Sequence, residues 1–89
     1  MKYAVWGTGI RGNLAASFIG VENIDVFIDE NPKLHSDTCF GRKIVSFSDY
    51  LKKYGDCYII VSPNDYGGIV ELLKMHKIKR YSLLKDIIY

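Results

Sequence analysis

The sequence predicts an α/β domain, an open parallel sheet of about four strands with helices on both faces, in three layers. Short apolar runs alternate with segments of helical periodicity, and a glycine cluster separates the first run from the first helix. Apolar runs of this kind are typical of buried parallel strands, which are joined by helical crossovers. The length of 89 residues allows one small domain, residues 1–89, and 48% apolar with 25% charged residues is a globular composition.

The first thirty residues predict a strand, a helix and a second strand. Residues 2–6 form a β-prone apolar run that stops at glycines, and residues 24–28 form another that stops at Asp29. Between them, Leu14 and Phe18 recur at helical spacing from Ile10 onward, which indicates an amphipathic helix of about three turns.

The rest of the chain predicts two further helices, each followed by a strand. In chain order the segments are a loop at 33–42, a short edge strand or extended segment at 43–45, a helix at 49–54, a strand at 57–61, a turn at 62–65, a helix at 66–76, a strand at 80–84 and an apolar tail at 87–88. Ser46 or Ser48 caps the first of these helices, and Gly55 ends it. The expected strand order is second, first, third, fourth, which places a ligand between the first and third strands.

Charge and cysteine content exclude several classes of protein. A formal charge of +2 gives no electrostatic reason to expect nucleic-acid binding. Cys39 and Cys57 lie 18 residues apart without partners at zinc-site spacing, so we expect no metal and reduced thiols, as in the cytoplasm. Glycines and polar residues interrupt the apolar N-terminal stretch, so neither a signal peptide nor a membrane segment is expected.

A GxGxxG motif occupies residues 7–12, directly after the first strand and at the start of the first helix. The first glycine allows the tight turn, the second leaves room for a phosphate, and the third lets helix and strand pack closely. The first helix then directs its free N–H groups at the phosphates. The candidate nucleotide-binding residues of this loop are Gly7, Thr8, Gly9, Ile10, Arg11 and Gly12. This context predicts a Rossmann-like mononucleotide- or dinucleotide-binding domain.

Asp29 ends the second strand 17 residues after Gly12, where a carboxylate can accept both ribose hydroxyls of an adenosine or a uridine. It would repel a 2′-phosphate, so NAD is preferred to NADP, and a UDP-sugar is the alternative ligand of the same site. Glu30 is the neighbouring candidate, but the strand register favours Asp29. The competing interpretation is a sheet that keeps its glycine turn for packing and binds no nucleotide.

Two further residues have two open roles each. Ser62 follows the third strand, where it either lines the nucleotide pocket beside Gly7 or, like Asn64, caps the next helix. Arg11 either contacts a diphosphate or points to solvent.

Several segments resemble the N-terminal nucleotide-binding domains of bacterial surface-polysaccharide enzymes. These segments are residues 3–12, 26–32, 41–46 and 58–62. Such domains precede the acyltransferase part of sialic-acid O-acetyltransferase-like enzymes, and similar ones occur in nucleotide-sugar epimerases and dehydratases. The resemblance implies a nucleotide or nucleotide-sugar site at the three glycines and Asp29. Acyltransferases of this type carry a histidine in the glycine loop, where Ile10 and Arg11 stand here, so acetyl transfer by this chain alone is not expected.

Three functions follow as candidates. The first is a binding module for NAD or a nucleotide-sugar that is part or partner of a polysaccharide-synthesis enzyme. The second is a minimal NAD-dependent oxidoreductase, although the second mononucleotide half is missing and no acid–base pair stands out. The third is a redox-sensing or dimerisation domain, since a small open sheet exposes edges through which a homodimer can form.

Overall fold

Six strands form one sheet in the order β3-β4-β2-β1-β5-β6 in a computed structural model that describes residues 1–88. The strands are β1 (Tyr3–Trp6), β2 (Ile24–Ile28), β3 (Thr38–Cys39), β4 (Arg42–Val45), β5 (Tyr58–Val61) and β6 (Tyr81–Leu83). The helices are α1 (Ile10–Ile19), α2 (Phe47–Lys53), α3 (Gly67–Met75) and α4 (Leu84–Ile88), with short 3-10 helices η1 (Val21–Asn23) and η2 (Pro32–Leu34). No helix within residues 1–88 is long and apolar enough to cross a membrane.

The predicted order of the four main strands is confirmed, because β2, β1, β5 and β6 are neighbours in that order and run parallel. The predicted number of about four strands is wrong. β4 adds to β2 in parallel where residues 43–45 were expected to be a short edge strand or an extended segment. β3 lies inside the segment 33–42, which was expected to be a loop, and pairs with β4 in an antiparallel hairpin. Phe40 and Gly41 have φ of 52° and 76°, which suits a two-residue hairpin turn. β3 contains only Thr38 and Cys39, so it is too short for a recognisable apolar period.

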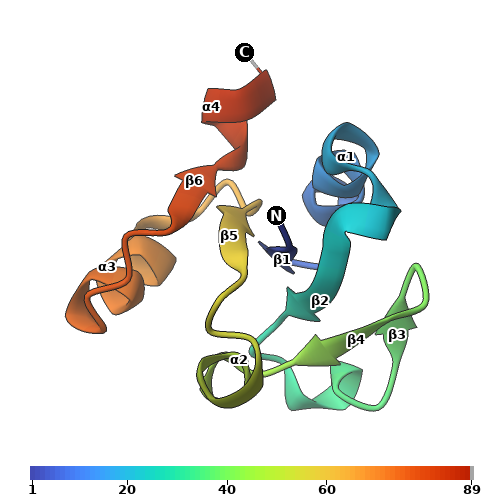
Figure 1. The fold of residues 1–89 in the computed structure, drawn as a ribbon, viewed down its shortest axis with the longest axis horizontal. Coiled ribbons are helices and arrows are strands. Elements are labelled where there is room, and N and C mark those ends of the chain that lie inside the picture. The colour runs from blue at the N-terminus through green and yellow to red at the C-terminus, as the bar shows by residue number, and fades with distance from the viewer. Residues whose placement is uncertain (89) are drawn as a thin grey trace.

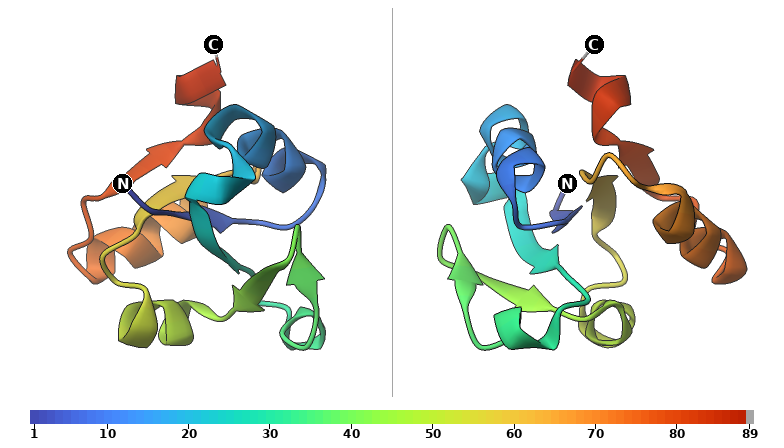
Figure 2. Two further views of the ribbon diagram at one scale, coloured as in Figure 1. Left: turned by 45° about the vertical axis from the view of Figure 1, so that its right-hand side comes forward. Right: turned by 180° about the vertical axis from the view of Figure 1, so that it is seen from behind.

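Helices cover both faces of the sheet, as the three-layer prediction requires. Figures 1 and 2 show α1 and α3 on opposite sides of the central strands β1 and β5. Leu84 of α4 joins the cluster of buried residues on the α1 face, while α2 and α3 contribute to the other cluster. Alternate residues of β1 serve the two clusters: Val5 packs on the α1 side, whereas Ala4 and Trp6 pack on the α3 side.

The face that α1 presents to the sheet is made of small residues. Gly12, Ala15 and Ala16 are buried, whereas the residues that carried the helical spacing point outward. Leu14 is 37% and Phe18 is 56% exposed. Small inner side chains bring the helix close to the sheet, so the larger ones of the same helix remain outside. The amphipathic helix expected from the sequence is therefore an apolar helix with a partly exposed apolar stripe.

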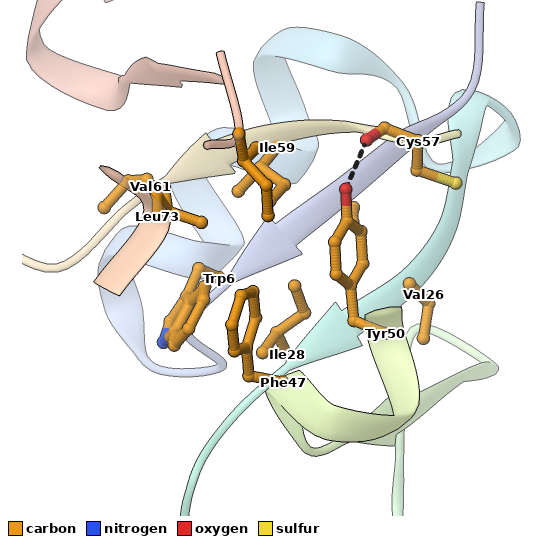
Figure 3. Packing of buried hydrophobic residues seen from close by; sticks show 11 residues of the cluster. Trp6, Val26, Ile28, Phe47, Tyr50, Cys57, Ile59, Val61 and Leu73 are labelled. Carbon is orange, nitrogen blue, oxygen red and sulfur yellow. Dashed lines mark hydrogen bonds between the residues drawn. The ribbon is translucent and has the colours of Figure 1, made fainter. Parts of the chain in front are cut away.

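The core on the α2 side is organised by aromatic rings (Figure 3). Phe47 stacks on Tyr50 with ring centroids 5.9 Å apart and lies 5.3 Å from the ring of Trp6. Tyr50 is fully buried, and its hydroxyl donates a 2.8 Å hydrogen bond to the carbonyl oxygen of Cys57. Ser46 caps α2 by accepting from the backbone N–H of Asp49, which confirms one of the two predicted caps. α2 is thereby fixed beneath the sheet.

Replacing Tyr50 with phenylalanine should lower the free energy of unfolding by about 1–2 kcal/mol, because the buried carbonyl of Cys57 loses its donor. Urea denaturation followed by circular dichroism measures the change. The control is Tyr54→Phe at the end of the same helix, since the Tyr54 hydroxyl takes part in none of the hydrogen bonds among residues 1–88. The control should stay within about 0.5 kcal/mol of the parent. Equal effects of the two substitutions would contradict this account.

Candidate functional site

The glycine loop lies at the carboxyl edge of the sheet, where β1, β2 and β5 end together. Gly7 donates its backbone N–H to the carbonyl oxygen of Ile28 over 2.8 Å and has a φ of +107°, a conformation that favours glycine. A Cβ on Gly7 would lie 2.5 Å from Oγ of Ser62, and a Cβ on Gly12 would overlap the carbonyl group of Gly7. Packing alone therefore requires these two glycines.

Gly9 differs from the other two glycines of the motif. A Cβ added there would have no protein atom within 4 Å, and its φ of −82° is accessible to any residue. Nothing within residues 1–88 accounts for a glycine at this position by crowding. A glycine that packing does not require at this position leaves space in which a ligand can approach the backbone closely.

The N-terminus of α1 is open. Gly9 is its N-cap and offers no side-chain cap, and the first turn carries no acidic residue. The first intrahelical bond runs from Asn13 N–H to the Gly9 carbonyl oxygen, so the N–H groups of Ile10, Arg11 and Gly12 precede the helical ladder. Ile10 is 87% exposed, so no side chain among residues 1–88 covers this end of the helix at that residue. Free N–H groups and the positive end of the helix dipole together favour an anion.

Asp29 is held against the glycine loop, as the spacing predicted. Its Oδ2 accepts a 3.1 Å hydrogen bond from the hydroxyl of Thr8, and its Oδ1 accepts one of 3.0 Å from the N–H of Asn31. Glu30 has a different partner, since its Oε1 accepts from the N–H of Phe47 at the start of α2. The two neighbouring carboxylates are thus separated, one facing the loop and one capping a helix.

A cavity of about 470 Å³ opens beside Asp29 and the glycine turn, a volume within the usual range for a small-molecule site. Pro63, Ile69 and Leu72 supply apolar walls, whereas every charged residue of its lining is acidic. These acidic residues are Asp29, Glu30 and Asp65. Of the lining residues, Gly7, Asp29 and Glu30 were candidates from the sequence. The sequence signal for Ile69 and Leu72 was their spacing on one face of α3, the helix that follows β5 at the predicted ligand-binding edge of the sheet.

Ser62 lies beside Gly7, as predicted, but it does not present its hydroxyl to the cavity. It is 1% exposed, and its Oγ donates to the Trp6 carbonyl oxygen over 2.5 Å. The alternative of a helix cap is wrong, since Tyr66 is the N-cap of α3 and no side chain caps that end. Nε of Arg11 donates to the Ser62 carbonyl oxygen over 2.6 Å, which lays the half-buried Arg11 side chain across the end of β5.

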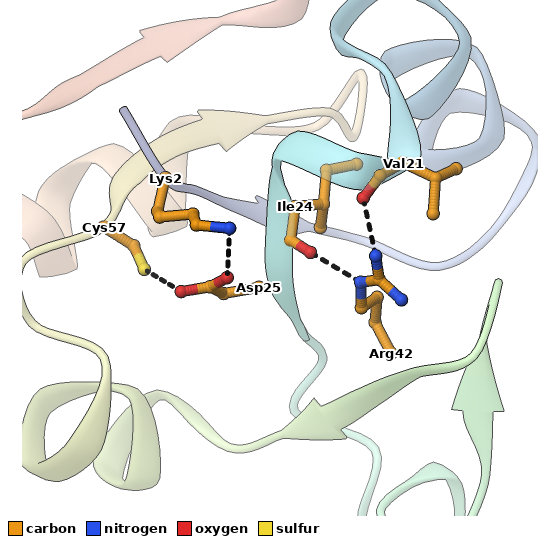
Figure 4. A network of polar contacts seen from close by, with 6 residues as sticks. All are labelled: Lys2, Val21, Ile24, Asp25, Arg42 and Cys57. Carbon is orange, nitrogen blue, oxygen red and sulfur yellow. Dashed lines mark hydrogen bonds and ion pairs between the residues drawn. The ribbon is translucent and has the colours of Figure 1, made fainter.

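The polar contacts at the amino edge of the sheet are structural (Figure 4). Cys57 is buried and its thiol donates to Asp25 over 3.7 Å, while Lys2 pairs with the same carboxylate at 3.6 Å. Burial and the nearby Asp25 raise the pKa of the Cys57 thiol to about 11, and burial also raises the pKa of Cys39. Both cysteines are therefore protonated at neutral pH, the less reactive form of a thiol.

No protein-family model, curated protein or solved structure matches the chain, so the resemblance to polysaccharide-synthesis domains stays a prediction.

Alanine substitutions at two glycines of the motif should distinguish a glycine that packing requires from one that has open space around it. Gly12→Ala should lower the free energy of unfolding by about 1–3 kcal/mol, because its Cβ would overlap the Gly7 carbonyl. Gly9→Ala, the matched control three residues away, should change it by less than about 0.5 kcal/mol. Chemical denaturation measures both values. A Gly12→Ala protein as stable as Gly9→Ala would show that α1 can move away from β1 without cost.

Proposed function

We propose that this domain binds a nucleotide in a Rossmann-like manner at the carboxyl edge of its sheet. The observation that carries the proposal is the Asp29 carboxylate, held by Thr8 between the open N-terminus of α1 and the 470 Å³ cavity. An anion site, a ribose acceptor and a partly apolar cavity stand side by side, in the order in which phosphate, ribose and base follow one another in a nucleotide. Packing accounts for Gly7 and Gly12, but it does not account for an open helix N-terminus, a carboxylate and a cavity next to one another.

Each part of the nucleotide has a partner in the proposed mode. The phosphate lies at the N–H groups that open α1, and Gly9 leaves it room to approach the backbone. Asp29 accepts the ribose hydroxyls in place of, or together with, the hydroxyl of Thr8. The base enters the cavity between Pro63 and the α3 residues Ile69 and Leu72. The acidic lining repels a 2′-phosphate, which favours NAD or a UDP-sugar over NADP.

We further propose that the domain works as a binding module, as part or partner of an enzyme that modifies nucleotide-sugars or surface polysaccharides in the cytoplasm. The resemblance of residues 3–12, 26–32, 41–46 and 58–62 to such domains supports this assignment. Among residues 1–88, those that line the cavity include carboxylates but no histidine, tyrosine or lysine, which gives little support to a minimal oxidoreductase. The raised pKa values of both thiols disfavour a redox sensor.

A second candidate function, self-association, is favoured by the outer face of α1. Ile10, Leu14 and Phe18 form an exposed apolar stripe, and within residues 1–88 the side chains that line a groove of about 620 Å³ beside it are apolar or uncharged polar ones. Phe18 belongs to both the stripe and the groove. A ridge next to a groove of the same apolar character suits a second copy of this chain, related by a two-fold axis. This face lies across the sheet from the cavity on the α3 side.

Asp29→Ala should weaken AMP or UMP binding at least tenfold, because the ribose loses charge-assisted hydrogen bonds. Isothermal titration calorimetry gives the dissociation constants. Asp25→Ala is the matched control, a half-buried aspartate at the opposite end of the same strand. This control should keep the parent affinity. If Asp29→Ala bound every nucleotide as tightly as Asp25→Ala does, the assigned site would be wrong.

Phe18→Ser should weaken a homodimer at least tenfold, since it removes the apolar side chain shared by stripe and groove. Light scattering over a concentration series gives the molar mass. The control is Phe40→Ser, which removes a phenylalanine of similar exposure, 52% against 56%, from the β3–β4 turn. A parent protein that stays monomeric at millimolar concentration would rule out self-association through this face.

A further inference from the structure

The space on the two sides of the glycine loop is very unequal. On the side of β2 and α3 lies the cavity of about 470 Å³. On the other side, above the ends of β5 and β6, the cavity is only about 20 Å³, room for about one water molecule. A dinucleotide spans the glycine loop and needs a nucleoside pocket on each side of it. Of these two cavities among residues 1–88, the one beside β2 and α3 has room for a nucleoside.

Basic side chains occupy the position of the missing pocket. Arg11 and Lys85 both line the 20 Å³ cavity, together with Tyr66. Nε of Arg11 is fixed on the Ser62 carbonyl oxygen at 2.6 Å, and Nζ of Lys85 lies 5.2 Å from the centre of the Tyr66 ring. No hydrogen bond or ion pair among residues 1–88 uses the two terminal nitrogens of Arg11. This guanidinium is therefore anchored at one nitrogen and retains donors for an anion.

The charges around the loop are thus divided between its two sides. The large cavity carries Asp29, Glu30 and Asp65, and the closed side carries Arg11 and Lys85. A nucleotide whose charges complement this arrangement places its neutral nucleoside in the large cavity, among the carboxylates. Its phosphates then pass the N-terminus of α1 and end at the basic side chains.

We propose that the site recognises a nucleoside diphosphate group, with Arg11 holding the distal phosphate, and that the second half of a dinucleotide finds no pocket. This inference rests on the proposed function and narrows its ligand. The recognised group is the same whether the diphosphate is free or carries a sugar, which would leave the site beyond Arg11. Lys85 is exposed and adds a weaker attraction to the same phosphate.

The test compares UDP with UMP, ADP with AMP, and NAD with ADP by calorimetry on the intact chain. We expect the better-bound diphosphate to bind about tenfold tighter than its monophosphate, and NAD to bind no tighter than ADP. Arg11→Gln should reduce the diphosphate preference to about twofold or less, and a circular dichroism spectrum and urea midpoint equal to those of the parent show that the variant folds. UDP-N-acetylglucosamine distinguishes the sources of the group: affinity equal to or above that of UDP identifies a sugar conjugate, and weaker binding identifies a free diphosphate.

Arg80→Gln is the matched control, because the Arg80 guanidinium also donates to a backbone carbonyl, that of Gly55, but at the amino edge of the sheet. It should retain the full diphosphate preference. The inference is overturned if Arg11→Gln keeps that preference, or if NAD binds tenfold tighter than ADP. Failure of the proposed function is a different result, in which no nucleotide, mono- or diphosphate, binds at millimolar concentration.

Discussion

The close contact between the start of α1 and the end of β1 is the constraint on which the rest of this structure depends. Gly12 lies directly over the Gly7 carbonyl, and Gly7 lies against the buried Ser62 hydroxyl, so three segments meet where no extra methyl group fits. Ala15 and Ala16 continue the same close approach along the helix. α1 is thereby held against the sheet with its N-terminus at the carboxyl edge. A looser contact would remove both the fixed direction of the helix dipole and the packing of this layer.

The same contact separates the two faces of the domain. Because small residues fill the inner side of α1, its larger apolar residues, Leu14 and Phe18, lie outside and leave an apolar surface on that face. On the opposite face, the large residues Trp6, Phe47 and Tyr50 hold α2 against the sheet. The candidate nucleotide cavity thus opens on the layer with bulky packing, and the candidate self-association surface on the layer with small packing. The two proposed functions do not compete for the same atoms.

The features of the fold that depend on local chemistry could be predicted from the sequence. The glycine spacing, the apolar runs and the position of Asp29 led to the four main strands, their order and the carboxylate at the loop. β3 and its hairpin with β4 were not predicted, because two residues with positive φ, Phe40 and Gly41, define the turn and no apolar period indicates it. The orientation of α1 depends on how closely the helix packs, which periodicity alone does not indicate.

Side-chain roles that depend on tertiary contacts could not be predicted from the sequence. The hydroxyl of Ser62 bonds to the Trp6 carbonyl, and Arg11 bonds to the Ser62 carbonyl, 51 residues away in the chain. The strand register was enough to favour Asp29 over the adjacent Glu30, but the bond from the N–H of Phe47 to Glu30 was beyond the sequence. Asp65, Ile69 and Leu72 join the cavity because the segment after β5 and α3 line it together with residues at the ends of β1 and β2.

The most direct test of nucleotide binding at the carboxyl edge is an amide NMR titration of the uniformly ¹⁵N-labelled chain with ADP and UDP. The account predicts saturable shifts of the amides of Gly9, Ile10, Arg11 and Gly12, together with those of Asp29 and the start of α3, and no shifts along the outer face of α1 beyond its first turn. An absence of shifts at millimolar nucleotide, or shifts confined to the groove beside Phe18, would contradict it. The glycine turn would then be a packing device, and the domain a self-association module.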